Sequence, residues 1–456
     1  MGKPRGQVSG IFLAVSVALA VYFITSLGLL SFEYSIVFIL ALCVFFVSFI
    51  RTDFALCILI LSMLFSPEIG AGHISGRTIA VRAEDLFLIV IFFGWLAKMA
   101  IRKEIGIVKF TSLNQPIFFY IFACLLSTLF GLLRGEIVLR SAIFYVFKYV
   151  EYFILFFMVI NNLKNERQAK MYVHVMLLTC FLVSCYGLYQ IPSGQRVTAP
   201  FEGDEGGEPN TFAGYLLLMM AVVIGYILYR PFRRARAVFI GLLGLMFYVF
   251  IYTLSRGAWL AFFPTIGVFL LLSRRYRGPL VLLVALGLLI LPFSMPKTVH
   301  QRIKETFNAE TTVKVLGKKM VISESAAARI NSWQVGIDQW SRHPFTGIGI
   351  PAGNVIDNQY MRVLAETGAL GFAIFLWLLA SIFLAGLRVF REMTDNPFAQ
   401  ALSIGFLAGM IGIMVHSITS ADFILIRIME PFWFLAAIVV MLPKLKAQEE
   451  EESANG

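Results

Sequence analysis

Long apolar stretches, separated by short polar turns, dominate the pattern of the chain. A helix needs about 20 mostly apolar residues to cross the hydrocarbon core of a bilayer, so each stretch of this length predicts a membrane-spanning helix. The stretches cover residues 10–30, 33–50, 53–66, 85–100, 116–133, 141–161, 171–190, 211–229, 237–254, 257–272, 279–295, 367–389, 400–418 and 424–442. They predict an all-α polytopic membrane protein with about 14 transmembrane helices, of which the third is the shortest.

The composition agrees with this pattern. Hydrophobic residues make up 59% of the chain and charged residues 14%, whereas a soluble domain has about 45–50% and about 25%. All five cysteines lie in apolar stretches without a Cys-x-x-Cys pair, so neither a disulfide framework nor a zinc site is expected. The first apolar stretch lacks a small-residue cleavage site, which predicts a retained span and not a signal peptide.

One long polar segment interrupts the alternation and divides the chain. We predict transmembrane helices 1–11 over residues 1–296, a large loop subdomain over 297–361, helices 12–14 over 362–443 and an acidic tail over 444–456. Within the loop, apolar residues recur at three- or four-residue spacing, at Ile330, Trp333, Ile337 and Trp340. This spacing predicts an amphipathic helix over 325–342 that lies in the membrane interface and ends before Pro344.

The basic residues indicate how the chain is oriented. The formal net charge of +11 would suit a nucleic-acid partner, but the lysines and arginines form short clusters between apolar stretches, chiefly at 230–236 and 274–277. Such clusters mark cytoplasmic loops. With fourteen spans they all fall on one side together with both termini, so we expect a multi-pass protein of the cytoplasmic (inner) membrane, an extracytoplasmic 297–361 loop and no nucleic-acid partner.

Arginines also stand on the predicted outer side, where short loops should contain few. They are Arg77, Arg82, Arg134, Arg140, Arg196, Arg256, Arg302, Arg329 and Arg342. A planar guanidinium binds phosphate oxygens two at a time, so an outer cavity ringed by arginines would suit a lipid-linked diphosphate. Each arginine alone also fits headgroup snorkelling or an ion pair, and Arg82 has local partners in Glu84 and Asp85. Arg256 is harder to explain in this way, because it lies in a turn of only a few residues.

Other polar groups leave alternatives open. The acidic loop at 201–208 fits either a metal site or a solvated turn, and the five histidines show no metal-ligand spacing; we predict no metal and no cofactor. Asp357 fits either a helix N-cap or a base that takes a proton from a sugar hydroxyl, and Glu366 is a second carboxylate candidate. His343 precedes a proline at a helix end, where capping is the alternative to a binding role. Motifs for nucleotide hydrolysis or common hydrolases are absent from the sequence.

Three groups of motifs resemble a known family. They are Ser-Arg-Gly-Ala-Trp-Leu at 255–260, Arg-Ile-Asn-Ser-Trp at 329–333 with His-Pro-Phe-Thr-Gly-Ile-Gly at 343–349, and Asp-Asn-Gln-Tyr at 357–360 with Leu-Ala-Glu-Thr-Gly-Ala-Leu-Gly at 364–371. Together they resemble the C-terminal region of the O-antigen ligase and O-antigen polymerase superfamily. Arg-Ala-Glu-Asp at 82–85, and Arg196 with Pro209 and Asn210, look like its weaker upstream motifs.

The resemblance implies a membrane glycosyltransferase that uses undecaprenyl-diphosphate-linked sugars outside the cytoplasm, without a metal or a nucleotide. Arg256 and Arg329 would then hold the diphosphate and stabilise the leaving group, with Arg82 and Arg196 as weaker matches. The matched motifs also place three further candidates beside the substrate, namely Asn210, Asn358 and His343. Asp357 or Glu366 would deprotonate the acceptor hydroxyl.

One departure from the ligase pattern bears on the reaction. Ligases carry His-Asn where this chain has Asp357-Asn358, and an aspartate is more like the polysaccharide polymerases. We therefore predict a polymerase of lipid-linked repeat units, whose partners are a lipid-linked glycan donor and acceptor, membrane lipid, and a chain-length regulator or flippase. The alternatives are a ligase, a lipid-binding scaffold, and a transporter or flippase, which would place its ionisable groups near mid-bilayer.

Overall fold

A computed structural model describes residues 42–74, 77–101, 109–201, 208–229, 233–294, 297–307, 311–315, 318–322, 324–352 and 356–455. Predicted span 10–30 and the first half of span 33–50 lie outside these ranges. The helices of the first half are α3 (Thr52–Phe65), α4 (Ala83–Ile101), α5 (Asn114–Leu133), α6 (Leu139–Asn162), α7 (Glu166–Gln190), α8 (Pro209–Tyr229) and α9 (Arg233–Tyr252). Those of the second half are α10 (Arg256–Leu272), α11 (Arg277–Ser294), α12 (Lys297–Phe307), α13 (Glu324–Arg342), α14 (Gln359–Glu392), α15 (Pro397–His416) and α16 (Ile426–Asn455).

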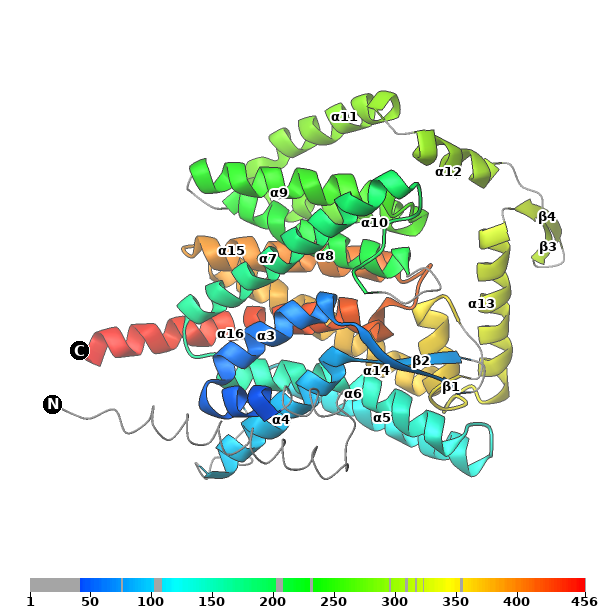
Figure 1. Cartoon of the computed structure of the whole chain (residues 1–456), viewed down its shortest axis with the longest axis horizontal. Coiled ribbons are helices and arrows are strands. Elements are labelled where there is room, and N and C mark those ends of the chain that lie inside the picture. Colours follow the sequence, from blue (N-terminus) through cyan, green and yellow to red (C-terminus); the bar gives the residue numbers. More distant parts are fainter. Residues whose placement is uncertain are drawn as a thin grey trace, which may run out of the picture.

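Most of these helices run side by side in one bundle (Figure 1). Helix α13 stands across one end of the bundle, with α12 nearby, and the C terminus lies at the opposite end (Figure 1). We call these the α13 end and the C-terminal end. The helix predicted over 325–342 is thus confirmed as α13, which begins one residue earlier.

The prediction of a helical, multi-pass membrane protein is confirmed, but the count of fourteen spans is not. Every predicted stretch from 53–66 onward coincides with a helix. Seven helices of the described chain are long and apolar enough to cross a membrane, namely Asn114–Leu133, Leu139–Asn162, Glu166–Ser193, Pro209–Tyr229, Gln359–Glu392, Pro397–His416 and Ile426–Ala454. An eighth is added if the pair Arg256–Leu272 and Arg274–Leu282, bent by 107°, is one span.

Two short hairpins were not predicted. Strand β1 (Glu68–Ile74) pairs antiparallel with β2 (Arg77–Arg82), and β3 (Thr311–Val315) with β4 (Lys318–Ile322). The first hairpin leads directly into α4, and the second lies between α12 and α13. Strands of five to seven residues are too short to appear in a search for apolar stretches of about 20 residues, which explains why the all-α prediction missed them.

Helices α8 and α15 form the most extensive contact between two elements of the described chain. A Cβ atom on Gly225 would lie 2.2 Å from the carbonyl oxygen of Ala401, and one on Gly405 would lie 2.7 Å from the Cα atom of Val222. Small residues let the backbones of membrane helices approach closely, and van der Waals packing then holds them together. This pair forms the centre around which α9, α10 and α16 pack.

Helix α14 is broken at Gly368, where φ is +67° and ψ is −173°. The turn after α13 fills the break: the backbone N–H of Ile348 donates to the carbonyl of Ala365 at 3.0 Å, and that of Ala369 donates to the carbonyl of Pro344 at 2.8 Å. A Cβ atom on Gly368 would lie 2.4 Å from the carbonyl carbon of Phe345. The two backbones therefore touch, and glycine is required there for both its dihedral angle and its size.

The contact at Gly368 can be separated from its backbone strain. We expect Gly368→Ala to lower the melting temperature of the purified protein in detergent by more than Gly135→Ala does. Both glycines have a positive φ, which disfavours any other residue, but a Cβ atom on Gly135 would meet nothing within 4 Å. Equal shifts for the two variants would show that the contact with Phe345 does not matter.

Candidate active site

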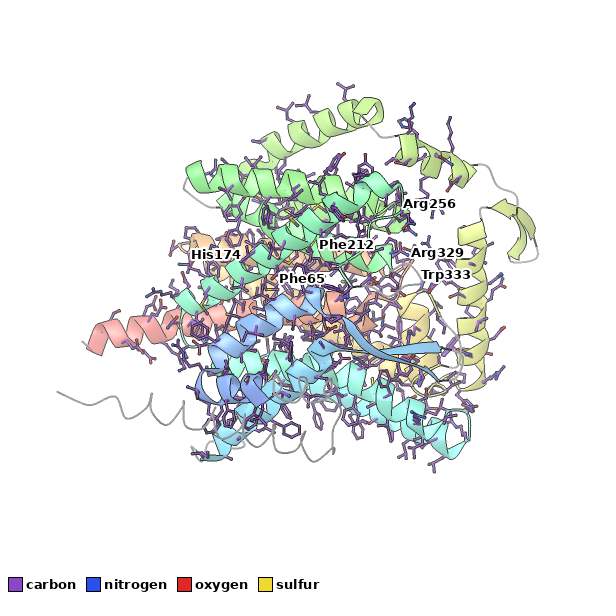
Figure 2. All side chains as sticks on the ribbon, viewed as in Figure 1. Phe65, His174, Phe212, Arg256, Arg329 and Trp333 are labelled. Atoms are coloured by element: carbon purple, nitrogen blue, oxygen red, sulfur yellow. The ribbon has the colours of Figure 1, made fainter. Side chains whose placement is uncertain are left out.

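Four arginines from separate elements gather at the α13 end. They are Arg196 in the loop between α7 and α8, Arg256 at the start of α10, Arg302 in α12 and Arg329 in α13. Burial, together with the positive charges of Arg302, Arg329 and Arg256, lowers the pKa of Arg196 to about 10. Figure 2 shows Arg256, Arg329 and Trp333 at this end of the bundle, and His174 toward the other. We call these four residues the arginine cluster.

Hydrogen bonds to the turn between α9 and α10 hold Arg196 in place. Its Nε atom donates to the carbonyl of Thr253 at 3.0 Å, and Nη2 donates to Oδ1 of Asn210 at 3.2 Å. The backbone N–H of Val197 also donates to the carbonyl of Tyr252 at 3.2 Å. The loop before α8 therefore lies along the turn that precedes Arg256. The predicted candidates Arg196, Asn210 and Arg256 are thus neighbours in the structure.

The start of α10 abuts the loop between α15 and α16. A Cβ atom on Gly257 would lie 2.2 Å from Oγ1 of Thr419, so the residue after Arg256 has no room for a side chain. Beneath this contact, buried His416 pairs through Nδ1 with Oδ2 of Asp422 at 2.8 Å. No sequence motif marked this pair, because its two members belong to α15 and the loop that follows it.

Asp357 lies close to Arg329. Burial lowers the pKa of Arg329, the negative charge of Asp357 opposes this effect, and Arg302 adds to it. The backbone N–H of Asp357 donates to Oγ of Ser332 at 2.7 Å, which joins the start of α14 to α13 one turn after Arg329. The carboxylate of Asp357 is exposed. An exposed carboxylate beside a group of guanidinium groups can accept a proton from a bound hydroxyl while the arginines hold an anion.

The alternative that Asp357 caps α14 is wrong, because Asn358 is the cap. Oδ1 of Asn358 accepts from the backbone N–H of Met361 at 3.0 Å, and Nδ2 donates to the carbonyl of Ile418 at 2.9 Å. Both ends of this amide are therefore occupied within the protein. Capping by Asn358 leaves the preceding side chain outside the helix.

The described contacts of three other candidates lead away from the arginine cluster. Glu366 is fully buried, where its Oε1 accepts from Nε of Arg362 at 3.0 Å and from the backbone N–H of Ala352 at 3.2 Å. His343 pairs through Nε2 with Oε1 of Glu136 at 2.7 Å. A guanidinium nitrogen of Arg82 lies 4.0 Å from Oε1 of Glu84, and the backbone N–H of Arg82 donates to Asp85.

The structure also bears on metal binding and on residues not chosen from the sequence. Within the described part of the chain, no group of three or more His, Cys, Asp or Glu side chains could hold a metal ion. Residues 202–207 of the acidic loop lie outside that part.

Arg302 belongs to the arginine cluster, although the sequence predicted only that it lies on the outer side and gave it no role in the site. Its guanidinium group pairs with the carboxylate of Glu305 at 2.8 Å.

A comparison with family models relates part of the chain to a known family. Residues 241–376 match the O-antigen ligase family. The matched segment runs from α9 into α14 and contains Arg256, Arg302, Arg329 and Asp357, while Arg196 precedes it. The predicted resemblance to an O-antigen ligase/polymerase-like family is confirmed over this segment. No curated protein matches the chain.

This O-antigen ligase-like assignment applies to the part of the chain that builds most of the cluster. Members of the family are membrane enzymes that act on lipid-linked glycans. The match includes α10, α12, α13 and the start of α14, which supply three of the four arginines and the exposed carboxylate. The fourth arginine reaches them through the hydrogen bonds of the loop before α8.

The capping role of Asn358 predicts effects of different size for two neighbouring substitutions. Asn358→Ala is expected to lower the free energy of unfolding by about 1 kcal/mol, because it removes an N-cap. Asp357→Ala is expected to change it by less than about 0.5 kcal/mol, as an exposed substitution does. Thermal unfolding in detergent compares the two variants. A larger loss for Asp357→Ala would mean that its carboxylate has a structural role.

Proposed function

We propose that the protein is a membrane glycosyltransferase that polymerises undecaprenyl-diphosphate-linked oligosaccharide repeat units on the outer face of the cytoplasmic membrane. The observation that carries this proposal is the convergence of Arg196, Arg256, Arg302 and Arg329 beside exposed Asp357. In this proposal the α13 end faces outward and α13 lies along the membrane interface. The donor and acceptor are both lipid-linked glycans, and a chain-length regulator or flippase is the expected protein partner.

The charges of the arginine cluster suit a diphosphate that joins a lipid to a sugar. Four guanidinium groups and the two nearby carboxylates, Glu305 and Asp357, leave a net charge of 4 − 2 = +2. A diphosphate esterified at both ends carries two negative charges. The positive charges of Arg302, Arg329 and Arg256 lower the pKa of Arg196, so these cations repel one another, and an anion between them would relieve that repulsion. Planar guanidinium groups would also grip its oxygens in pairs.

The reaction follows from the positions of these groups. The acceptor hydroxyl would attack the anomeric carbon of the donor sugar while the bond from that carbon to the diphosphate oxygen breaks. Asp357 would accept the hydroxyl proton, and the arginines would stabilise the charge that develops on the departing lipid diphosphate. Holding both substrates in line could supply much of the acceleration, since a lipid diphosphate is already a good leaving group. Glu366 would position the turn at 343–352 and not touch substrate.

A ligase is the second candidate, because the matched family is described as O-antigen ligase. In a ligase the same cluster would hold the donor, and the acceptor would be a different lipid or a protein. The two candidates therefore differ in the acceptor and not in the diphosphate site. Asp357, which stands where ligases carry histidine, favours the polymerase.

Reconstitution tests the proposed function. Purified full-length protein in lipid receives an undecaprenyl-diphosphate-linked repeat unit from its host and no other acceptor. A ladder of products identifies a polymerase, and transfer only after a second acceptor is added identifies a ligase. Arg256→Lys and Arg329→Lys are each expected to slow the reaction roughly 10²–10³-fold, the usual loss when one charge-stabilising donor is removed, because lysine keeps the charge but loses the two-pronged donor.

The matched control is Arg342→Lys at the exposed C-terminal end of α13, which is expected to retain the wild-type rate. Full activity of both Arg256→Lys and Arg329→Lys would contradict paired binding of phosphate oxygens. Movement of the lipid-linked sugar across the bilayer without any product would contradict the enzyme.

The role of Asp357 as a base predicts a specific pH dependence. Asp357→Asn is expected to lose at least about 100-fold in kcat, within the range for removal of a general base, with little change in KM. Asp357→His is expected to keep part of the activity near pH 8 and to lose it as the pH falls through about 6.5, where histidine titrates in peptides. Rate profiles of both variants between pH 5.5 and 8.5 check this. An Asp357→His profile with the same shape as that of the wild type would rule out a base at this position.

A further inference from the structure

The C-terminal end of the bundle contains a basic cavity that the proposed reaction does not use. The cavity has a volume of about 1210 Å³ and lies where α3 and α7 begin and α4 and α6 end. Helix α7 has 25 residues and is about 37 Å long, and Arg196 follows its far end. The basic cavity and the arginine cluster are therefore separated by about the thickness of a membrane.

Cations dominate the lining of this cavity. The lining contains one carboxylate, Asp53, and five cations, so its net charge is +4. The cations are Arg51, Lys98, Lys109, Lys164 and Arg167. The carboxylate is already occupied, because it pairs with Nη2 of Arg51 at 3.2 Å. Basic side chains at the cytoplasmic ends of membrane helices are common, but such side chains need not converge on a cavity.

The cations are held close to one another by the protein. Nζ of Lys109 donates to the carbonyl of Leu163 at 2.9 Å, and Nζ of Lys98 donates to Oγ1 of Thr52 at 3.1 Å. Burial lowers the pKa of Lys109, and the positive charges of Lys444 and Lys164 lower it further. A concave surface of one charge sign concentrates ions of the opposite sign.

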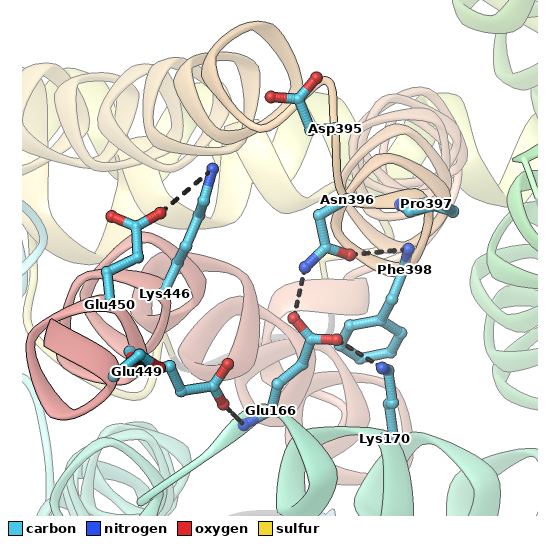
Figure 3. A pocket seen from close by; sticks show the side chains of 10 residues that line it. Glu166, Lys170, Asp395, Asn396, Pro397, Phe398, Lys446, Glu449 and Glu450 are labelled. Carbon is cyan, nitrogen blue, oxygen red and sulfur yellow. Dashed lines mark hydrogen bonds and ion pairs between the residues drawn. The ribbon is translucent and has the colours of Figure 1, made fainter. Parts of the chain in front are cut away.

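A second cavity on the other side of the α7 start provides a contrast (Figure 3). It has a volume of about 730 Å³ and is lined by both signs of charge. Glu166 pairs with Lys170, and Lys446 lies 3.7 Å from Glu450 (Figure 3). With Asp395 and Glu449 the lining has four carboxylates and two lysines, which gives a net charge of −2. The positive charge of the basic cavity is thus a local feature and not a property of the whole end of the bundle.

Apolar side chains complete the lining of the basic cavity. Trp95 and Met99, near the end of α4, lie beside the cations. A phosphate group with an attached hydrocarbon chain would match both features, because basic pockets between membrane helices bind phosphate-bearing lipid headgroups. We propose that the basic cavity is a binding site for a phosphate group, such as the headgroup of an anionic phospholipid.

Titration calorimetry of the full-length protein in detergent tests this site. The probes are dihexanoyl phosphatidylglycerol, dihexanoyl phosphatidylcholine and inorganic phosphate. We expect phosphatidylglycerol to bind, and the double variant Lys164→Gln/Arg167→Gln to weaken that binding roughly 25-fold, since each lysine or arginine contributes roughly fivefold to attraction of an anionic lipid. Both side chains are exposed, so their replacement should leave the fold intact.

The matched control is Arg274→Gln/Arg275→Gln, which removes two exposed charges between α10 and α11, outside the cavity. It should bind phosphatidylglycerol as the wild type does. Binding of phosphatidylglycerol but not inorganic phosphate would identify a lipid headgroup as the ligand, and equal binding of both would identify a free phosphate. The proposal is overturned if neither binds, if phosphatidylcholine binds equally well, or if the control loses as much affinity as the cavity variant.

Discussion

The architecture of the candidate site depends on a carboxylate that has no access to water. Glu366 is fully buried, and a buried charge is tolerated only when charged or polar donors surround it. Its donors are Arg362 one turn earlier, Tyr149 of α6 and the backbone of Ala352. Removing one partner of a buried pair typically costs about 3–5 kcal/mol. The turn after α13 must therefore return to α14, and this return brings Arg329 and Asp357 to one end of the bundle.

The arginine cluster illustrates how a fold can hold like charges together. Burial and mutual repulsion both lower the pKa of Arg196, so the folded chain keeps these groups close at an energetic cost. Contacts elsewhere in the fold offset this cost. The loop before α8 is hydrogen-bonded to the turn before α10, and Gly257 allows α10 to pack closely against the loop between α15 and α16. Three of the four arginines fall in the segment that matches the O-antigen ligase family. A site preorganised for an anion is consistent with enzymes that act on lipid-linked glycans.

Much of the fold could be read from the chain, because its main elements follow from local patterns. The apolar stretches from 53–66 onward all coincide with helices, and the spacing of Ile330, Trp333, Ile337 and Trp340 predicted α13 to within one residue. The number of spans could not be obtained in this way, since apolar length does not reveal the 107° bend after α10. The hairpins were missed because each strand is shorter than the patterns that were sought.

The residues of the candidate site likewise fall into those that the sequence predicted and those that only the structure brought together. Arg256, Arg329 and Asp357 could be chosen from the sequence, because Arg256 stands in a short turn between two apolar stretches, and Arg329 and Asp357 lie in the family-like motifs of the long polar loop. Their convergence with Arg196 and Arg302 and the closed network around Glu366 depend on contacts between residues up to about 220 positions apart in the chain. The sequence by itself determined which segments are helical and which chemistry is available, because these depend on neighbouring residues. Only the tertiary structure decided which charged groups meet, because packing between distant helices sets those distances.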